Sequence, residues 1–166
     1  MESREELDLL LKELVKDYAF LVKGFSNPLA RQVSRLSAGA EDYRVLKSYI
    51  VDLARYANQA YHRDGTDRYM YRAPVLMLFH GDRRAMSYEE NAHLVCHHAM
   101  LAAVSLGLGS TIIGMVPPIV DRSKLLRERY GIPKGNKVMT SLILGYPRYR
   151  YRKSIRRDLK AVRIID

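Results

Sequence analysis

The chain has 166 residues, of which 48% are hydrophobic and 28% charged, and its formal net charge is +10. This composition is typical of one folded domain spanning 1–166 and argues against a disordered chain. The one cysteine, Cys96, excludes an internal disulfide and a cysteine-based metal centre. The acidic start lacks the apolar stretch of a signal peptide, so a cytoplasmic protein is the simplest expectation.

The first third of the chain has the pattern of helices. Apolar residues recur at three- and four-residue spacing after a Ser3–Glu6 capping box, which predicts a helix that stops near Gly24. A short helix is expected over 29–37 and a long one over 41–61.

Strands and helices alternate in the rest of the chain, which predicts an α+β fold. Helices are expected over 88–106 and 121–130. The uncharged stretch 94–120 is long enough to span a bilayer, but its glycines and prolines break it, so we expect a buried helix there and no membrane span. Strands are expected at 73–80 (a continuous apolar run, covered on both faces), 109–114, 136–144 and 161–165.

A glycine junction lies in the second half of the chain. A helical run stops at Gly107-Leu108-Gly109, and a β-branched stretch then reaches Gly114. Glycines leave the backbone bare, so a flat ligand can lie against its N–H groups. The simpler interpretation of an isolated Gly-x-Gly is a helix C-cap followed by a buried strand.

The C-terminal segment is strongly basic. Eight basic residues and one acid lie between Arg148 and Arg163, and tyrosines alternate with the first of these basic residues. Three interpretations stay open: a solvated tail, a phosphate-binding segment, and a nucleic-acid-binding segment that uses arginine and tyrosine.

Other polar residues give weaker signals. His93 and His97 have the spacing of a shared metal site, but Leu94 replaces the glutamate of a zinc protease and no third ligand is evident, so no metal is expected. Histidines that pack a helix or an interface are the better interpretation. Cys96 is expected to be a buried thiol, and no catalytic acid–base pair is evident.

Taken together, 73–157 resembles the C-terminal half of the nitroreductase family of FMN-dependent flavoenzymes. Met100–Gly109 matches the family's helix ending in Leu-Ala-Ala-x-x-Leu-Gly-Leu-Gly. The Gly145-Tyr146-Pro147 segment with its basic tail is most similar to a subgroup in which a ferredoxin-like 4Fe–4S module precedes the flavin domain. The resemblance implies eight cofactor-binding residues: Ile112, Ile113, Gly114 and Met115 against the isoalloxazine ring, and Arg152, Lys153, Arg156 and Arg157 at the FMN phosphate.

The resemblance also implies an architecture and an activity. The fold would have three layers, α-β-α, with a small mixed or antiparallel sheet between helices. The protein would be a homodimer with FMN at the interface and with residues 158–166 packed on the partner. Electrons would pass from NAD(P)H or a ferredoxin through the flavin to a small-molecule acceptor, such as a nitroaromatic or a quinone.

Two features of the family have no counterpart in this sequence. The opening Arg-Arg-Ser-x-Arg strand and the Asn-x-Gln-Pro turn are both missing, so the chain is expected to lack the family's N-terminal FMN-binding segment. Each lost charge-assisted contact weakens phosphate binding by about 1.5–3 kcal/mol. Two alternatives therefore remain: a truncated, non-catalytic relative that keeps only the fold and the dimer, and a nucleic-acid-binding protein that uses the basic tail.

Overall fold

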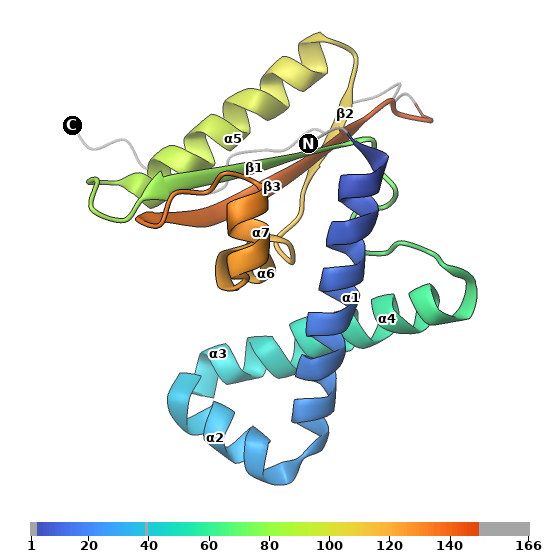
Figure 1. The fold of residues 1–166 in the computed structure, drawn as a ribbon, viewed down its shortest axis with the longest axis vertical. Helices are drawn as coiled ribbons and strands as arrows, with labels where there is room; N and C mark the ends of the chain where they lie inside the picture. Colours follow the sequence, from blue (N-terminus) through green and yellow to red (C-terminus); the bar gives the residue numbers. More distant parts are fainter. Residues whose placement is uncertain (1–2, 39, 150–166) are drawn as a thin grey trace, which may run out of the picture.

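The structure, a computed structural model, describes residues 3–38 and 40–149. Figure 1 follows the elements along the chain from blue to red. The first half is helical, with α1 (Arg4–Ser26), α2 (Pro28–Ala38), α3 (Ala40–Val45), a π-helix η1 (Leu46–Val51) and α4 (Asp52–Asp64). The second half contains β1 (Val75–Asp82), α5 (Tyr88–Ser105), β2 (Gly109–Ile112), α6 (Pro117–Arg122), α7 (Lys124–Arg129) and β3 (Asn136–Gly145).

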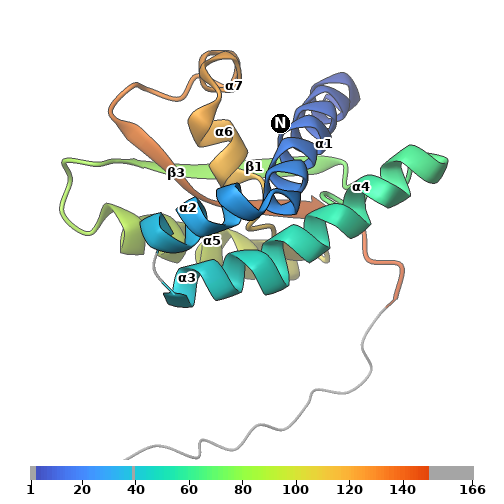
Figure 2. The same ribbon diagram turned by 90° about the horizontal axis from the view of Figure 1, so that it is seen from below.

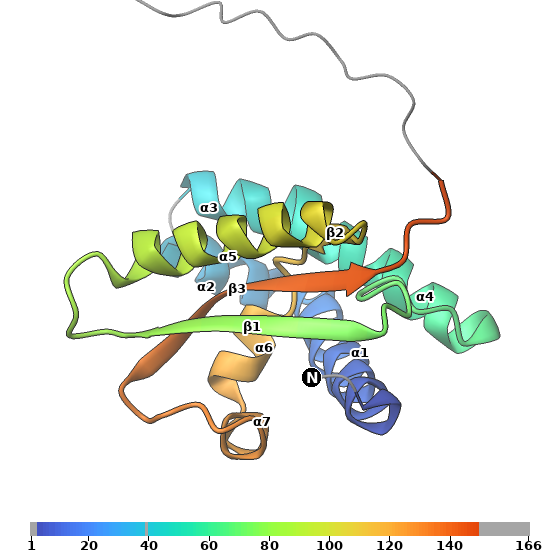
Figure 3. The ribbon, with the colours of Figure 1, turned by 90° about the horizontal axis from the view of Figure 1, so that it is seen from above.

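Three antiparallel strands form one sheet in the order β1-β3-β2. Leu76 of β1 is paired with Ile143 of β3, and Ser110 of β2 is paired with Leu144 on the other side of β3. Helix α5 covers one face of this sheet, while α1 and α6 lie on the other (Figures 1 and 3). The expected α+β fold, with a small antiparallel sheet between helical layers, is confirmed.

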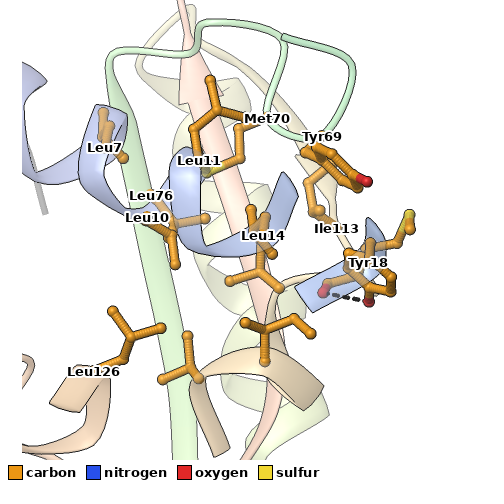
Figure 4. Close-up of a cluster of buried hydrophobic side chains, with 14 of the residues drawn as sticks. Leu7, Leu10, Leu11, Leu14, Tyr18, Tyr69, Met70, Leu76, Ile113 and Leu126 are labelled. Atoms are coloured by element: carbon orange, nitrogen blue, oxygen red, sulfur yellow. Dashed lines mark hydrogen bonds between the residues drawn. The ribbon is translucent and has the colours of Figure 1, made fainter. Parts of the chain in front are cut away.

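The larger core lies between α1 and the sheet. The apolar stripe of α1 points into it at every turn, and Figure 4 shows these side chains gathered against β1, α7 and the segment after β2. As expected, α1 is an amphipathic helix, but it runs two residues past Gly24, and the Ser3 hydroxyl makes no capping hydrogen bond. Its buried residues are Leu7, Leu10, Leu11, Leu14, Val15, Tyr18 and Phe25.

The helices after α1 form an arm that folds back along it. Helix α2 returns from the end of α1, and α3, η1 and α4 then run past α1 as one helical rod (Figure 2). The single helix expected over 41–61 therefore contains a π-helical turn and continues to Asp64. Gly65, at φ +73°, ends it in a left-handed conformation that other residues rarely adopt.

Helix α5 contradicts the expectation of a buried helix. It places short side chains on the sheet, where Ala92, Cys96 and Ala103 are buried. Its larger apolar side chains point outward, with Leu101 55% and Val104 70% exposed. Small residues allow a helix to lie close to a sheet, so hydrophobic content alone does not decide which face is covered.

Strand β1 and the segment 121–130 also differ from their predictions. β1 is an edge strand in the described part of the chain, and Met77 is 36% exposed, so it is not covered on both faces. Two short helices replace the one expected over 121–130, because Ser123 accepts a hydrogen bond from Leu126 N at 3.3 Å and starts α7. The strand expected over 161–165 lies outside the described residues.

Among the described helices, none combines the length and the apolar character needed to cross a bilayer.

Candidate functional site

The segment 112–115 leaves β2 with its side chains alternating between two sides. Ile112 is 48% exposed and Gly114 is also exposed, whereas Ile113 and Met115 are buried in the main core. The two buried side chains anchor the segment, and the backbone at Gly114 faces outward.

Ser141, in the central strand β3, holds this segment through two hydrogen bonds. Ile113 N donates to the Ser141 carbonyl oxygen at 2.9 Å, which continues the β2–β3 pairing by one residue. The Ser141 hydroxyl, Oγ, donates to the Ile113 carbonyl oxygen at 2.6 Å. Ser141 is fully buried, so both bonds are shielded from water.

Tyr18 of α1 holds the other end of the segment. Its hydroxyl donates to the Met115 carbonyl oxygen at 2.7 Å (Figure 4), and its ring stacks on Tyr69 with 5.4 Å between centroids. The Tyr69 hydroxyl donates to Asn58 Oδ1 at 2.7 Å, and Asn58 Nδ2 donates to the Val15 carbonyl oxygen at 3.1 Å. Burial raises the pKa of Tyr18 to about 12 and also raises the pKa of Tyr69, so both rings stay neutral donors.

The backbone at Gly114 is free to meet a ligand. Within the described residues, neither Gly114 N–H nor Met115 N–H has a hydrogen-bond acceptor. A Cβ built on Gly114 would meet no atom within 4 Å, so the space in front of this residue is open. The segment therefore combines unused donors, open space and the exposed apolar side chain of Ile112.

Asp67 organises the loop that precedes β1. This buried carboxylate accepts hydrogen bonds from the backbone N–H groups of Tyr69, Met70 and Arg72 at 2.8–2.9 Å. It thereby holds Tyr71 and Arg72 at φ near +56° and +55°. This loop and the ends of β2 and β3 line a groove of about 400 Å³, beside the point where Tyr146 and Pro147 leave the sheet.

Cys96 and the histidines of α5 take no part in this site. Cys96 is 1% exposed, and burial raises the pKa of its thiol, which confirms the buried thiol expected from the sequence. His93 and His97 lie exposed on α5. In the part of the chain that the structure describes, no three His, Cys, Asp or Glu side chains are grouped to hold a metal ion.

The predicted site residues divide into two sets. Ile112, Ile113, Gly114 and Met115 form the segment described above. The predicted phosphate-binding residues Arg152, Lys153, Arg156 and Arg157 lie outside the described residues, as does the basic tail from residue 150 onward. Sequence reasoning missed the residues that hold the segment, Tyr18 and Ser141, because neither stands near 112–115 in the sequence.

Solved structures of three bacterial proteins share the fold. One is a nitroreductase with bound FMN from Bacteroides fragilis, with TM-score 0.57, 21% identity, and 73% of this chain and 64% of that chain covered. Another is a nitroreductase with bound FMN from Desulfitobacterium hafniense, with TM-score 0.52 and 22% identity. The match covers 64% of this chain and 58% of that chain. The third is an FMN-dependent nitroreductase from Clostridium difficile, with TM-score 0.53 and 19% identity. The match covers 68% of this chain and 71% of that chain.

These likenesses show the fold, and the chain spans 64% and 58% of the length of the first two proteins. No curated protein matches the chain. A family model supplies the assignment, because the model of the nitroreductase family matches residues 28–146, which include the site segment, all three strands and α5. The chain belongs to the nitroreductase family.

Proposed function

We propose that the chain is an FMN-dependent oxidoreductase of the nitroreductase type, with the flavin ring against 112–115. The observation that carries this proposal is the Gly114 N–H, which has no acceptor among the described residues and belongs to an exposed glycine beside the exposed Ile112 side chain. The FMN bound to the Bacteroides and Desulfitobacterium proteins supports it.

The residues present fit the ring portion of FMN. An isoalloxazine ring needs apolar contact on its face and hydrogen-bond donors at the edge that carries N5 and O4. Ile112 would supply the apolar contact, and the Gly114 N–H would supply a donor that does not titrate. Bound FMN would supply the electron-transfer chemistry. The arginine and lysine side chains at 152, 153, 156 and 157 would hold its phosphate through charge-assisted hydrogen bonds.

The reaction we propose has two half-reactions at the same flavin. NAD(P)H or a ferredoxin would reduce the flavin, and a nitroaromatic, a quinone or a similar small molecule would then oxidise it. We place this activity in the cytoplasm, in one domain over 1–166 that is most similar to the ferredoxin-fused subgroup.

A homodimer is part of the proposal. The outward face of α5 carries Leu94, Leu101 and Val104 in one stripe, each more than half exposed. Exposed apolar patches of this kind mark interaction surfaces, and a twofold axis lets one patch bury its own copy.

Helix α2 supports the same conclusion. Its apolar side chains Leu29, Val33 and Leu36 are 65–80% exposed, while Arg31 Nε donates to the Phe25 carbonyl oxygen at the end of α1. A helix with its apolar face outward needs a partner to cover it. We assign that partner to a second copy of this chain, with the flavin at the interface.

The test is a visible absorbance spectrum of the purified chain, recorded before and after addition of FMN and removal of the excess. We expect an oxidised-flavin spectrum that bleaches with NADH or dithionite. Gly114→Ala places a methyl group in the open space without a clash and should weaken FMN binding by on the order of tenfold. Gly24→Ala, in α1 and equally free of clashes, is the matched control and should bind FMN like the wild type.

A wild-type chain that retains no flavin would refute the proposal. A non-catalytic relative that keeps only the fold and the dimer would then be the better account.

A further inference from the structure

We infer that Ser141 is a positioning residue that turns the Gly114 N–H toward the flavin and strengthens it as a donor. This inference rests on the proposed function, because it assigns a task to a residue that touches no part of the proposed ligand. The inference follows from the direction of the Ile113–Gly114 peptide and from the hydrogen bond by which Ser141 holds that peptide.

The Ile113–Gly114 peptide is fixed from its carbonyl side. The described residues contain no cis peptide, so this peptide is trans and its C=O and N–H point in opposite directions. The Ser141 hydroxyl lies on β3 and binds the Ile113 carbonyl oxygen at 2.6 Å. With the carbonyl held toward β3, the Gly114 N–H must point away from the sheet.

The Gly114 N–H therefore points toward the exposed side of the segment. It has no acceptor among the described residues, Gly114 is exposed, and a Cβ built on this residue would meet no atom within 4 Å apart from those of Gly114 and its two chain neighbours. Rotating the peptide would break the Ser141 bond and bury the N–H against β3. The same hydroxyl that fixes the peptide also polarises it, since a hydrogen bond accepted by a carbonyl strengthens the donor at the other end of the peptide.

Ser141 is a polar residue at a fully buried position of β3, which is unusual for a strand. Ser141 is fully buried in the central strand, where β-branched and apolar residues are the usual choice. Its backbone carbonyl already accepts from Ile113 N at 2.9 Å, so the pairing of the two segments does not need the side chain. The hydroxyl adds only the bond to the Ile113 carbonyl oxygen.

The neighbouring Thr140 offers a matched control. It is also buried on β3, 3% exposed, but its hydroxyl lies by Cys96 of α5, on the opposite face of the sheet from the Ser141 side chain. Thr140→Val and Ser141→Ala each remove one buried hydroxyl from the same strand. A purely structural role for Ser141 would make the two variants behave alike.

The experiment has one arm without flavin and one with it. In the flavin-free protein, the Gly114 amide resonance in a ¹⁵N spectrum should shift in Ser141→Ala and stay in place in Thr140→Val. In an FMN titration followed by fluorescence, Ser141→Ala should raise the Kd by on the order of tenfold, the loss expected for one hydrogen bond, whereas Thr140→Val should keep the wild-type Kd. Ser141→Thr retains a hydroxyl and should restore most of the affinity.

Each result decides a separate question. An unmoved Gly114 amide in Ser141→Ala, or equal losses of affinity in the alanine and valine variants, would overturn the role of Ser141. A wild-type chain without FMN binding would refute the proposed function and the donor role together. The amide arm would still show whether Ser141 orients the peptide, which separates the two failures.

Discussion

Replacing Tyr18 by phenylalanine would remove one buried hydroxyl and leave the ring in place. Tyr18 is 4% exposed, and its hydroxyl donates to the Met115 carbonyl oxygen at 2.7 Å. A buried acceptor that loses its donor costs about 1–3 kcal/mol. A chain of this size changes its Tm by about 2–4 °C per kcal/mol, so Tyr18→Phe should melt roughly 2–12 °C below the wild type. The stacking of the ring on Tyr69 should be retained.

The same hydroxyl makes the stability depend on pH. Burial raises the pKa of Tyr18 from 10.0 to about 12, so the unfolded chain ionises this group first. Its contribution is therefore fully present below pH 10 and is lost as the pH rises toward 12. The loss amounts to about 3 kcal/mol, since one unit of pKa corresponds to about 1.36 kcal/mol. Tyr18→Phe lacks this group, so its stability should fall less steeply than that of the wild type in this window.

Urea unfolding followed by circular dichroism, at pH values from 8 to 12, measures both effects. Tyr49→Phe is the control, because the Tyr49 side chain is 65% exposed. Equal losses of stability above pH 10 in Tyr18→Phe and the wild type would refute the reasoning. So would a Tyr18→Phe variant as stable as the wild type at pH 8.

Three further substitutions test other parts of the structure. Asp67→Ala removes the acceptor of three backbone N–H bonds and should lower the free energy of unfolding by about 3 kcal/mol or more, measured by urea titration, with Asp67→Asn as the milder comparison. Gly65→Ala places a side chain at φ +73° and should cost about 1 kcal/mol in the same assay; a neutral result would contradict the left-handed end of α4. Leu101→Glu puts a charge in the exposed stripe of α5 and should convert the dimer that we propose into a monomer in sedimentation velocity; a variant that is still dimeric would place the interface elsewhere.

The elements that the sequence predicted well are those whose pattern is local. The stripe of α1 repeats over five turns, and the apolar run that becomes β3 is bounded by turn residues, so each is recognisable without its partners. The boundary at Ser123 was missed because one serine hydroxyl separates two short helices within a segment that has helical periodicity throughout.

The exposure of α5 was not predictable from its composition. The helix is apolar on both sides, and its hydrophobic pattern does not favour one face. The face of α5 that packs on the sheet is selected by side-chain size. Alanines and Cys96 fit against the sheet, while Leu101 and Val104 do not. The distance between the helix and the sheet decides which face of α5 is buried, and that distance is a property of the folded molecule.

The candidate site shows the same division. The glycine junction and the family resemblance indicated 112–115, and the structure places this segment at an open face. The two hydroxyls that hold it come from Tyr18 and Ser141, which are 97 and 28 residues away from the carbonyls they bind. Nothing in the local pattern marks them, since tyrosine in an apolar stripe and serine in a strand are both ordinary.

The central place of β3 has a consequence for how this chain folds during translation. Within the described residues, β1 and β2 both pair with β3 and not with each other, and β3 is the last of the three to be synthesised. At roughly 5–20 residues per second, synthesis of β1 begins about 4–14 s before synthesis of its partner strand ends. Helices α1 to α4 can form in that interval because their hydrogen bonds are local. The sheet has to wait, so the apolar side chains of β1 depend on these helices, or on a chaperone, for cover until the ribosome reaches Gly145.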